Sequence, residues 1–220
     1  MARGDGHLGT TDTILETAER LFAERGFGAV SLREIARESG VAVSSVTYHF
    51  DDRIGLLGAI YARHTKPMNA RRKELLGEAL RIRDAGDRLT AILRAYLLPA
   101  FTSSSDTGQG GGARFTRLRA VLSAEGDPEA RRIIAESFDE TTRAFIDAIQ
   151  GCLPGAARAD IVWRSQFLLG ALYYTLINPD RIARLSDGAI TGTDHDAAIA
   201  QLVEATHASL MALDRGTAAD

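Results

Sequence analysis

Apolar side chains recur at helical spacing along almost the whole chain, and the first fifty residues show this most clearly. The spacing predicts three short helices, over residues 10–25, 31–39 and 43–50. Gly26 and Gly40 follow the first two helices, where the left-handed backbone that glycine tolerates commonly ends a helix. The chain has no convincing run of strand-like alternation, so the pattern predicts an all-α fold.

The rest of the chain keeps the helical period, interrupted by prolines and by one polar stretch. Pro67 should end a helix that starts at residue 52, and Pro99 should kink or end a later one. Residues 102–112 carry no apolar side chain and should form a mobile loop. Further helices are expected over 69–84, 87–101, 113–124, 128–151, 157–177, 179–186 and 194–213. These breaks predict a flexible arm over 1–9, a helix-turn-helix domain over 10–66 and a larger helical domain over 67–220.

The stretch 31–53 is the hardest to explain by core packing alone. Ser31 can cap the second helix, and Glu34 can complete a capping box. On a helical wheel, the third helix has an apolar side and a polar side. The apolar side holds Val43, Val46 and Phe50, and the polar side holds Ser44, Ser45, Tyr48 and His49. Hydroxyl, phenol and imidazole groups hydrogen-bond phosphates and base edges in a major groove, so a DNA-binding helix-turn-helix is predicted. A helical hairpin in an ordinary bundle has the same spacing.

The ordered combination of residues over about 10–57 resembles the DNA-binding domain of the TetR family of bacterial transcriptional regulators. The residues that carry this resemblance are Ile14-Leu15, Ala18, Leu21-Phe22, Gly26-Phe27, Ser31, Ile35-Ala36, Gly40-Val41 and Val46–Phe50. The resemblance implies a homodimeric, ligand-responsive regulator, most simply a repressor that a small-molecule effector releases from a palindromic operator. It also implies a ligand-binding and dimerisation domain after Pro67, where only the general helical plan matches.

The same resemblance implies which residues meet double-stranded operator DNA. They are Ser31, Ala42, Val43, Ser44, Ser45, Thr47, Tyr48, His49 and Arg53. Thr47 stands where the family often has an aromatic residue, and Arg53 where it usually has lysine. The helical wheel places Val43 inward, whereas the family uses that position on DNA.

Charge does not by itself favour a nucleic-acid partner. The whole chain has a net charge of −3, and residues 1–66 contain eight Lys or Arg against nine Asp or Glu. A DNA-binding protein with this balance has to segregate its charges by face and to depend on neutral donors and dimerisation. The acidic balance supports the alternative of an all-α small-molecule-binding or enzymatic protein whose helix-turn-helix is only structural.

Two late helices are candidates for a dimer interface. Residues 163–178 are apolar nearly all round, which implies burial on more than one face. By resemblance, this helix pairs with residues 194–213 to form a four-helix interface between two copies. The interface candidates are Gly170, Ala171, Leu202 and Leu210. A core helix within one monomer remains the alternative.

An effector cavity in the middle of the chain is also implied by the resemblance. Its candidate lining is aromatic, with two possible polar anchors, and would suit an apolar or aromatic ligand. The candidates are Tyr96, Phe101, Phe115, Arg119, Phe138, Phe145, Gln166, Phe167, Tyr173 and Tyr174. Each of them could instead be a plain core residue.

Catalytic and metal-binding patterns are not found in the sequence. The five histidines lack metal-binding spacing, and the single cysteine, Cys152, permits neither an intramolecular disulfide nor a cysteine metal cluster. We therefore predict no enzyme activity, no cofactor and no metal. An apolar leader segment and an apolar run long enough for a membrane span are also lacking, so a cytoplasmic location is expected.

Overall fold

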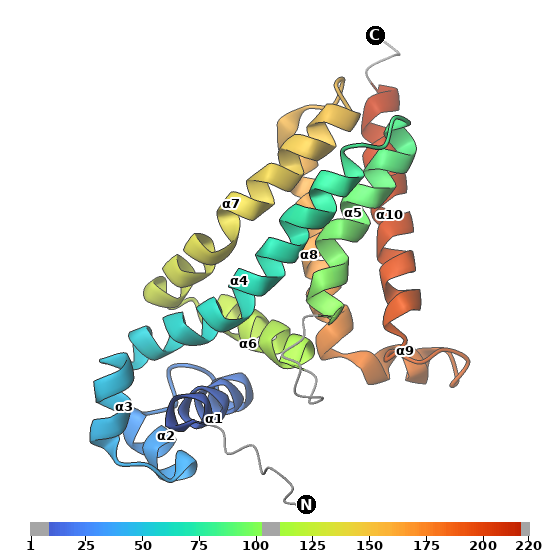
Figure 1. The fold of residues 1–220 in the computed structure, drawn as a ribbon. Helices are drawn as coiled ribbons and strands as arrows, with labels where there is room; N and C mark the ends of the chain where they lie inside the picture. Colours follow the sequence, from blue (N-terminus) through green and yellow to red (C-terminus); the bar gives the residue numbers. More distant parts are fainter. Residues whose placement is uncertain (1–8, 103–110, 217–220) are drawn as a thin grey trace, which may run out of the picture. The chain divides into compact units, whose positions relative to one another are not determined.

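The computed structural model describes residues 9–102 and 111–216, and all regular structure in these two ranges is α-helical (Figure 1). The prediction of an all-α fold is therefore confirmed. The arm predicted over 1–9 lies almost wholly outside the described residues, as do residues 103–110 of the loop predicted over 102–112, whose two ends belong to helices. The helices are α1 (Thr10–Arg25), α2 (Leu32–Ser39), α3 (Val43–Phe50), α4 (Arg53–Ala79), α5 (Ala85–Thr102), α6 (Gly111–Glu125), α7 (Pro128–Cys152), α8 (Arg158–Ile177), α9 (Pro179–Leu185) and α10 (His195–Gly216).

The prolines give the main difference between the predicted and the observed helices. The helix end predicted at Pro67 is wrong, because α4 runs without a break from Arg53 to Ala79. Pro67 is exposed whereas Thr65 and Met68 beside it are buried, so the hydrogen bond that proline removes faces water and tertiary packing holds the helix together. Pro99 does not end its helix directly either, since α5 continues to Thr102.

The chain divides into two compact units that do not follow the order of the sequence. One unit holds the chain up to His64 together with Arg117–Ser137, and the other holds Thr65–Thr116 together with the chain from Phe138 onward. Helices α4, α6 and α7 are therefore each shared between the units. The predicted domains, 10–66 and 67–220, differ from these units, because Arg117–Ser137 belongs to the unit of the helix-turn-helix.

The first unit is organised around α1, whose apolar stripe is completely buried. Ile14, Leu21 and Phe22 each have 0% exposure, and the Phe22 ring meets the Phe27 ring edge-on at 5.1 Å. Helix α1 packs on α2, and α2 packs on α3. This core sets the position of the short helix α3.

The second unit has its core between α5, α7, α8 and α10, where α10 packs against both α5 and α8 (Figure 1). No helix within the described residues combines the length and apolar character that a bilayer crossing requires. In the same residues, no group of His, Cys, Asp or Glu side chains is arranged to hold a metal ion.

Candidate functional site

The turn of the helix-turn-helix is fixed by backbone caps that the sequence predicted. Ser31 Oγ accepts a hydrogen bond from the N–H of Glu34 at 3.2 Å. Gly40 has a φ of 72°, and the N–H of Val41 returns to the carbonyl of Ala36 at 3.0 Å. Both ends of α2 are thus capped as expected. The Glu34 carboxylate does not complete the capping box but pairs with Arg25.

The outward face of α3 is small, polar and aromatic. Val46 and Phe50 are the buried residues of this helix. Tyr48 is 84% exposed, and its ring meets the neighbouring His49 ring at 5.2 Å. Val43 is 40% exposed, so the inward position that the wheel gave it is wrong. The remaining predicted DNA contacts also have accessible surface: Ser31, Ala42, Ser44, Thr47 and His49 are exposed, and Ser45 and Arg53 are half-buried.

A tight junction determines where α3 ends and α4 begins. Asp51 has φ 60° and ψ −68°, and the N–H of Asp52 donates to the carbonyl of Phe50 at 2.7 Å, which is the geometry of a strained γ-turn. Asp52 Oδ1 then accepts from the N–H of Gly55 at 2.8 Å. A Cβ atom on Gly55 would lie 2.2 Å from the Phe50 carbonyl oxygen, so this position needs glycine.

Arg53 holds the loop that leads into Ser31. Its Nη1 donates to the carbonyls of Phe27 at 3.2 Å and Val30 at 3.0 Å, and more weakly to that of Gly28 at 3.4 Å. The guanidinium also lies over the Phe27 ring, 4.8 Å from its centroid. Its role as a phosphate contact stays a prediction, but the structure gives it a second role inside the domain.

Glu125, the last residue of α6, holds the same loop although it lies far from it in the sequence. Its Oε2 accepts from the N–H of Phe27 at 3.0 Å, across 98 positions in the chain. A Cβ atom on Gly26, whose φ is 88°, would lie 1.9 Å from Glu125 Oε1. Sequence reasoning missed Glu125, because no local pattern shows that α6 meets the α1–α2 loop.

Most of the acidic side chains of α1 and α2 lie beside a basic side chain or a histidine. Glu38 lies 3.3 Å from Arg37, and Glu16 lies 3.2 Å from Arg63. Inside the unit, Glu19 meets His64 at 2.8 Å with both side chains 5% exposed. Helix α3 itself carries no acidic residue. Most of the negative charge of α1 and α2 therefore has an arginine close by, and the face of α3 carries no acidic side chain.

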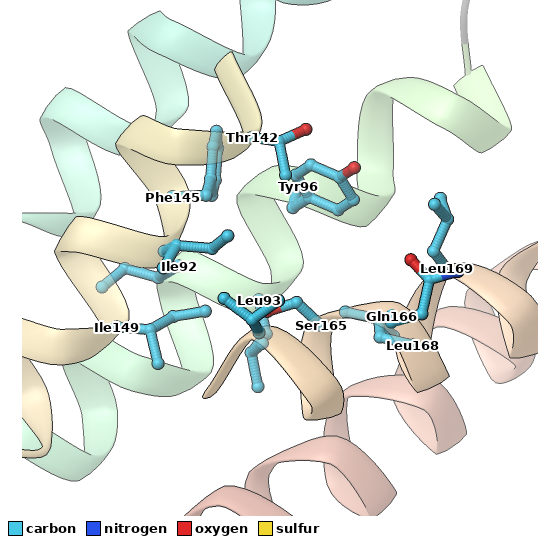
Figure 2. A pocket seen from close by; sticks show the side chains of 12 residues that line it. Ile92, Leu93, Tyr96, Thr142, Phe145, Ile149, Ser165, Gln166, Leu168 and Leu169 are labelled. Carbon is cyan, nitrogen blue, oxygen red and sulfur yellow. The ribbon is translucent and has the colours of Figure 1, made fainter. Parts of the chain in front are cut away.

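A cavity of about 100 Å³, partly open to solvent beside the exposed residues Val162 and Gln166, lies in the second compact unit, between α5, α7 and α8 (Figure 2). Of the predicted ligand contacts, Tyr96, Phe145 and Gln166 line it. The other lining residues were missed: Ile92, Leu93, Thr142, Ile146, Ile149, Val162, Ser165, Leu168 and Leu169. The four-residue spacing of Ile92 and Tyr96 indicates that they share one face of a helix. Spacing within a helix does not indicate which helices pack around the cavity.

The other predicted lining residues lie elsewhere in the described structure. Phe101, Phe115 and Phe138 are buried away from the cavity. Arg119 is also buried, but it belongs to the first compact unit. Of the predicted lining residues on α8, Phe167 and Tyr174 are exposed and Tyr173 packs against the core.

Helix α8 has an exposed aromatic stripe. Trp163, Phe167 and Tyr174 are 60%, 56% and 53% exposed in the single chain, and Gly170 and Ala171 between them are also exposed. This spacing places the five residues along one side of the helix. Of the predicted interface residues on α10, Leu202 is half-buried, whereas Leu210 is only 1% exposed and has little surface left for a partner.

Comparisons with known proteins cover both halves of the chain. A family model described as "Bacterial regulatory proteins, tetR family" matches residues 14–60. A second, described as "Tetracyclin repressor-like, C-terminal domain", matches residues 94–209, just over half of the 220 residues.

Curated relatives match over shorter stretches. The HTH-type transcriptional repressor KstR2 of Rhodococcus jostii (strain RHA1) is 30% identical over 75 residues, which are 34% of this chain and 37% of that protein. The HTH-type transcriptional repressor BepR of Brucella suis biovar 1 is 36% identical over 58 residues, 26% of this chain and 28% of that protein. The chain thus aligns with about a third of the length of these relatives.

Solved structures match over nearly the full length. The crystal structure of a TetR-family transcriptional regulator from Bordetella parapertussis 12822 has a TM-score of 0.63 and covers 91% of this chain and 95% of that one. The two sequences are 19% identical, so this likeness concerns the fold alone.

Proposed function

Because this chain belongs to the tetR family of bacterial regulatory proteins, it is a helix-turn-helix transcriptional regulator, and we propose that it acts as a homodimeric repressor of a palindromic operator. A small-molecule effector would release it from the DNA. Family membership excludes the alternative of an enzyme with a merely structural helix-turn-helix. A regulator of this kind acts on the chromosome, so the cytoplasm remains its expected location.

The outward face of α3 is the observation that carries the proposal. A tyrosine that is 84% exposed on a helix held by two buried anchors has no role in the core and is available to an external partner. In our proposal the start of α3, Val43 to Ser45, meets base edges, and Thr47, Tyr48 and His49 bind bases or phosphates. Ser31 and Ala42 would supply phosphate contacts at the helix ends.

Dimerisation would use the exposed stripe of α8 together with α10. The aromatic residues Trp163 and Phe167 expose more than half of their surface, and Gly170 and Ala171 allow a second helix to approach closely. We leave Leu210 out of the proposed interface because it is buried within the chain. Two-fold symmetry would place the two α3 helices in major grooves about 34–36 Å apart.

Effector binding would act through α4. This helix carries Arg53, which holds the loop before Ser31, and also Arg72, whose Nε donates to the Tyr96 carbonyl at 2.9 Å. Tyr96 lines the cavity, so a ligand that moves it would bias the position of α4. The coupling between effector and operator is expected to be about 1–3 kcal/mol, the usual size for allosteric proteins.

A gel-shift titration on the DNA upstream of the gene tests the proposal. We expect a shift that resists competitor DNA and weakens with salt, although less steeply than for a strongly basic protein. Replacing Phe167 by Glu should give a monomer by analytical ultracentrifugation and lose the shift, whereas Leu185→Glu, at an exposed site on α9, should not. A stable wild-type monomer that binds the operator would contradict the dimer.

A further inference from the structure

The side chains that line the cavity between α5, α7 and α8 restrict the class of ligand further than "apolar or aromatic". None of the twelve described residues that line it carries a charge. Burying a carboxylate or an ammonium group without a charged partner is strongly unfavourable. An uncharged ligand is therefore favoured.

The size of the cavity limits the ligand as well. Its volume is about 100 Å³. An engineered apolar cavity of about 150 Å³ in another protein stays dry and binds benzene. With the side chains as they stand, the cavity fits a molecule of about one small ring or a short chain.

Ser165 offers a hydrogen-bond acceptor to the cavity. Its Oγ–H donates to the carbonyl of Ile161, one turn earlier in α8, at 2.8 Å. The proton of this hydroxyl is therefore engaged, and the oxygen is left with its lone pairs to accept. Figure 2 shows Ser165 beside Gln166 on α8, while Ile92, Phe145 and Ile149 come from the other two helices. The wall thus presents the Ser165 acceptor and the Gln166 amide on α8, and on α5 and α7 it presents mainly apolar side chains, with the hydroxyls of Tyr96 and Thr142 as the polar groups there.

We propose that the cavity binds a small uncharged molecule that has an apolar body of about one ring and one hydroxyl or N–H donor, and that Ser165 Oγ accepts that donor. The ring lies among Ile92, Phe145 and Ile149. This proposal rests on the proposed function, because it takes the cavity to be the effector site.

Calorimetric titration of the full chain with three single-ring probes tests the ligand class. Phenol has the donor, toluene replaces the hydroxyl with a methyl group of similar size, and benzoate carries a charge at neutral pH. We expect phenol and toluene to bind and benzoate not to bind. Binding of benzoate as tightly as phenol, or failure of phenol to bind at millimolar concentration, would overturn the proposal.

The role of Ser165 is tested by Ser165→Ala. Loss of one neutral hydrogen bond should weaken phenol roughly three- to tenfold and leave toluene unchanged. Ser123→Ala is the matched control, because Ser123 Oγ makes the same bond to the Arg119 carbonyl at 2.8 Å but lies in the other compact unit. An unchanged phenol-to-toluene ratio in Ser165→Ala would remove Ser165 from the proposal.

Gel shifts with the same probes separate this proposal from the proposed function. Operator binding with no ligand binding would refute the ligand class and keep the regulator. Phenol binding with the expected selectivity but without operator release would keep the ligand class and refute the effector role.

Discussion

Two tyrosines show how the outward face of α3 differs from the cavity of the second unit. Tyr48 is 84% exposed and its ring meets the adjacent His49, whereas Tyr96 is 8% exposed. The ring of Tyr96 packs against Phe145 at 5.2 Å and lies beneath the guanidinium of Arg72 at 4.1 Å. The face of α3 is built from sequence neighbours, and the cavity wall from residues on separate helices. Substitutions on the face of α3 should therefore change operator affinity, and substitutions in the cavity wall should change the free energy of unfolding.

The largest effect is expected from Arg72→Ala, within the second unit. Arg72 is 1% exposed, and its removal would leave a void beside Tyr96 and remove the hydrogen bond that Arg72 donates to the Tyr96 carbonyl. We expect the free energy of unfolding to fall by about 3 kcal/mol, as measured by urea denaturation. Arg71→Ala is the control, since Arg71 is an exposed residue of the same helix. Equal stability of the two variants would show that the cavity wall does not depend on Arg72.

Gly26→Ala should have the next largest effect, in the first unit but away from α3. The φ of 88° disfavours any Cβ atom, and this one would also meet Glu125 Oε1 at 1.9 Å and displace it from Phe27. The expected loss is about 2 kcal/mol in the free energy of unfolding. Gly28→Ala should have little effect, because a Cβ atom there meets nothing within 4 Å. A similar loss in both variants would mean that general loop stiffness, and not Glu125, is responsible.

Tyr48→Ala should separate affinity from stability. The side chain is mostly in water, so the free energy of unfolding should change by less than about 0.5 kcal/mol. Operator affinity, measured by fluorescence anisotropy, should fall by about 1–3 kcal/mol per lost base or phosphate contact. An operator affinity equal to that of wild type would remove Tyr48 from the proposed interface.

The two regions also differ in how far the sequence predicts them. Local rules were enough for Ser31 as an N-cap, for the turn at Gly40 and for the buried pair Val46 and Phe50, because these depend on residues within about one helical turn. The same rules failed at Pro67, where packing outweighs the intrinsic preference of proline.

Contacts between distant parts of the chain could not be read from helical spacing. Glu125 reaches Phe27 across 98 positions, and Ser165 lies with Ile92 in one cavity wall. Most of the aromatic residues predicted to line the cavity are core or surface residues instead. Periodicity shows that a helix face is apolar, but it does not show whether that face meets a cavity, a core or a partner.

Arg53→Lys gives the smallest expected effect. It tests a residue for which the family resemblance and the structure indicate different roles. The resemblance predicts a phosphate contact, for which the lysine that the family usually has would serve as well. In the structure a single nitrogen of Arg53, Nη1, donates to the carbonyls of Phe27 and Val30 while the planar guanidinium lies over the Phe27 ring, and lysine has no planar group to take that place. If the loop contacts dominate, the free energy of unfolding should fall by about 1 kcal/mol, while the salt dependence of operator binding stays the same because the charge is kept. Arg33→Lys, at an exposed position on α2, should leave stability unchanged. If Arg53→Lys were as stable as wild type, the loop contacts of the guanidinium would add little to stability, and a phosphate contact, which lysine serves as well, would be the better explanation for a cation at this position.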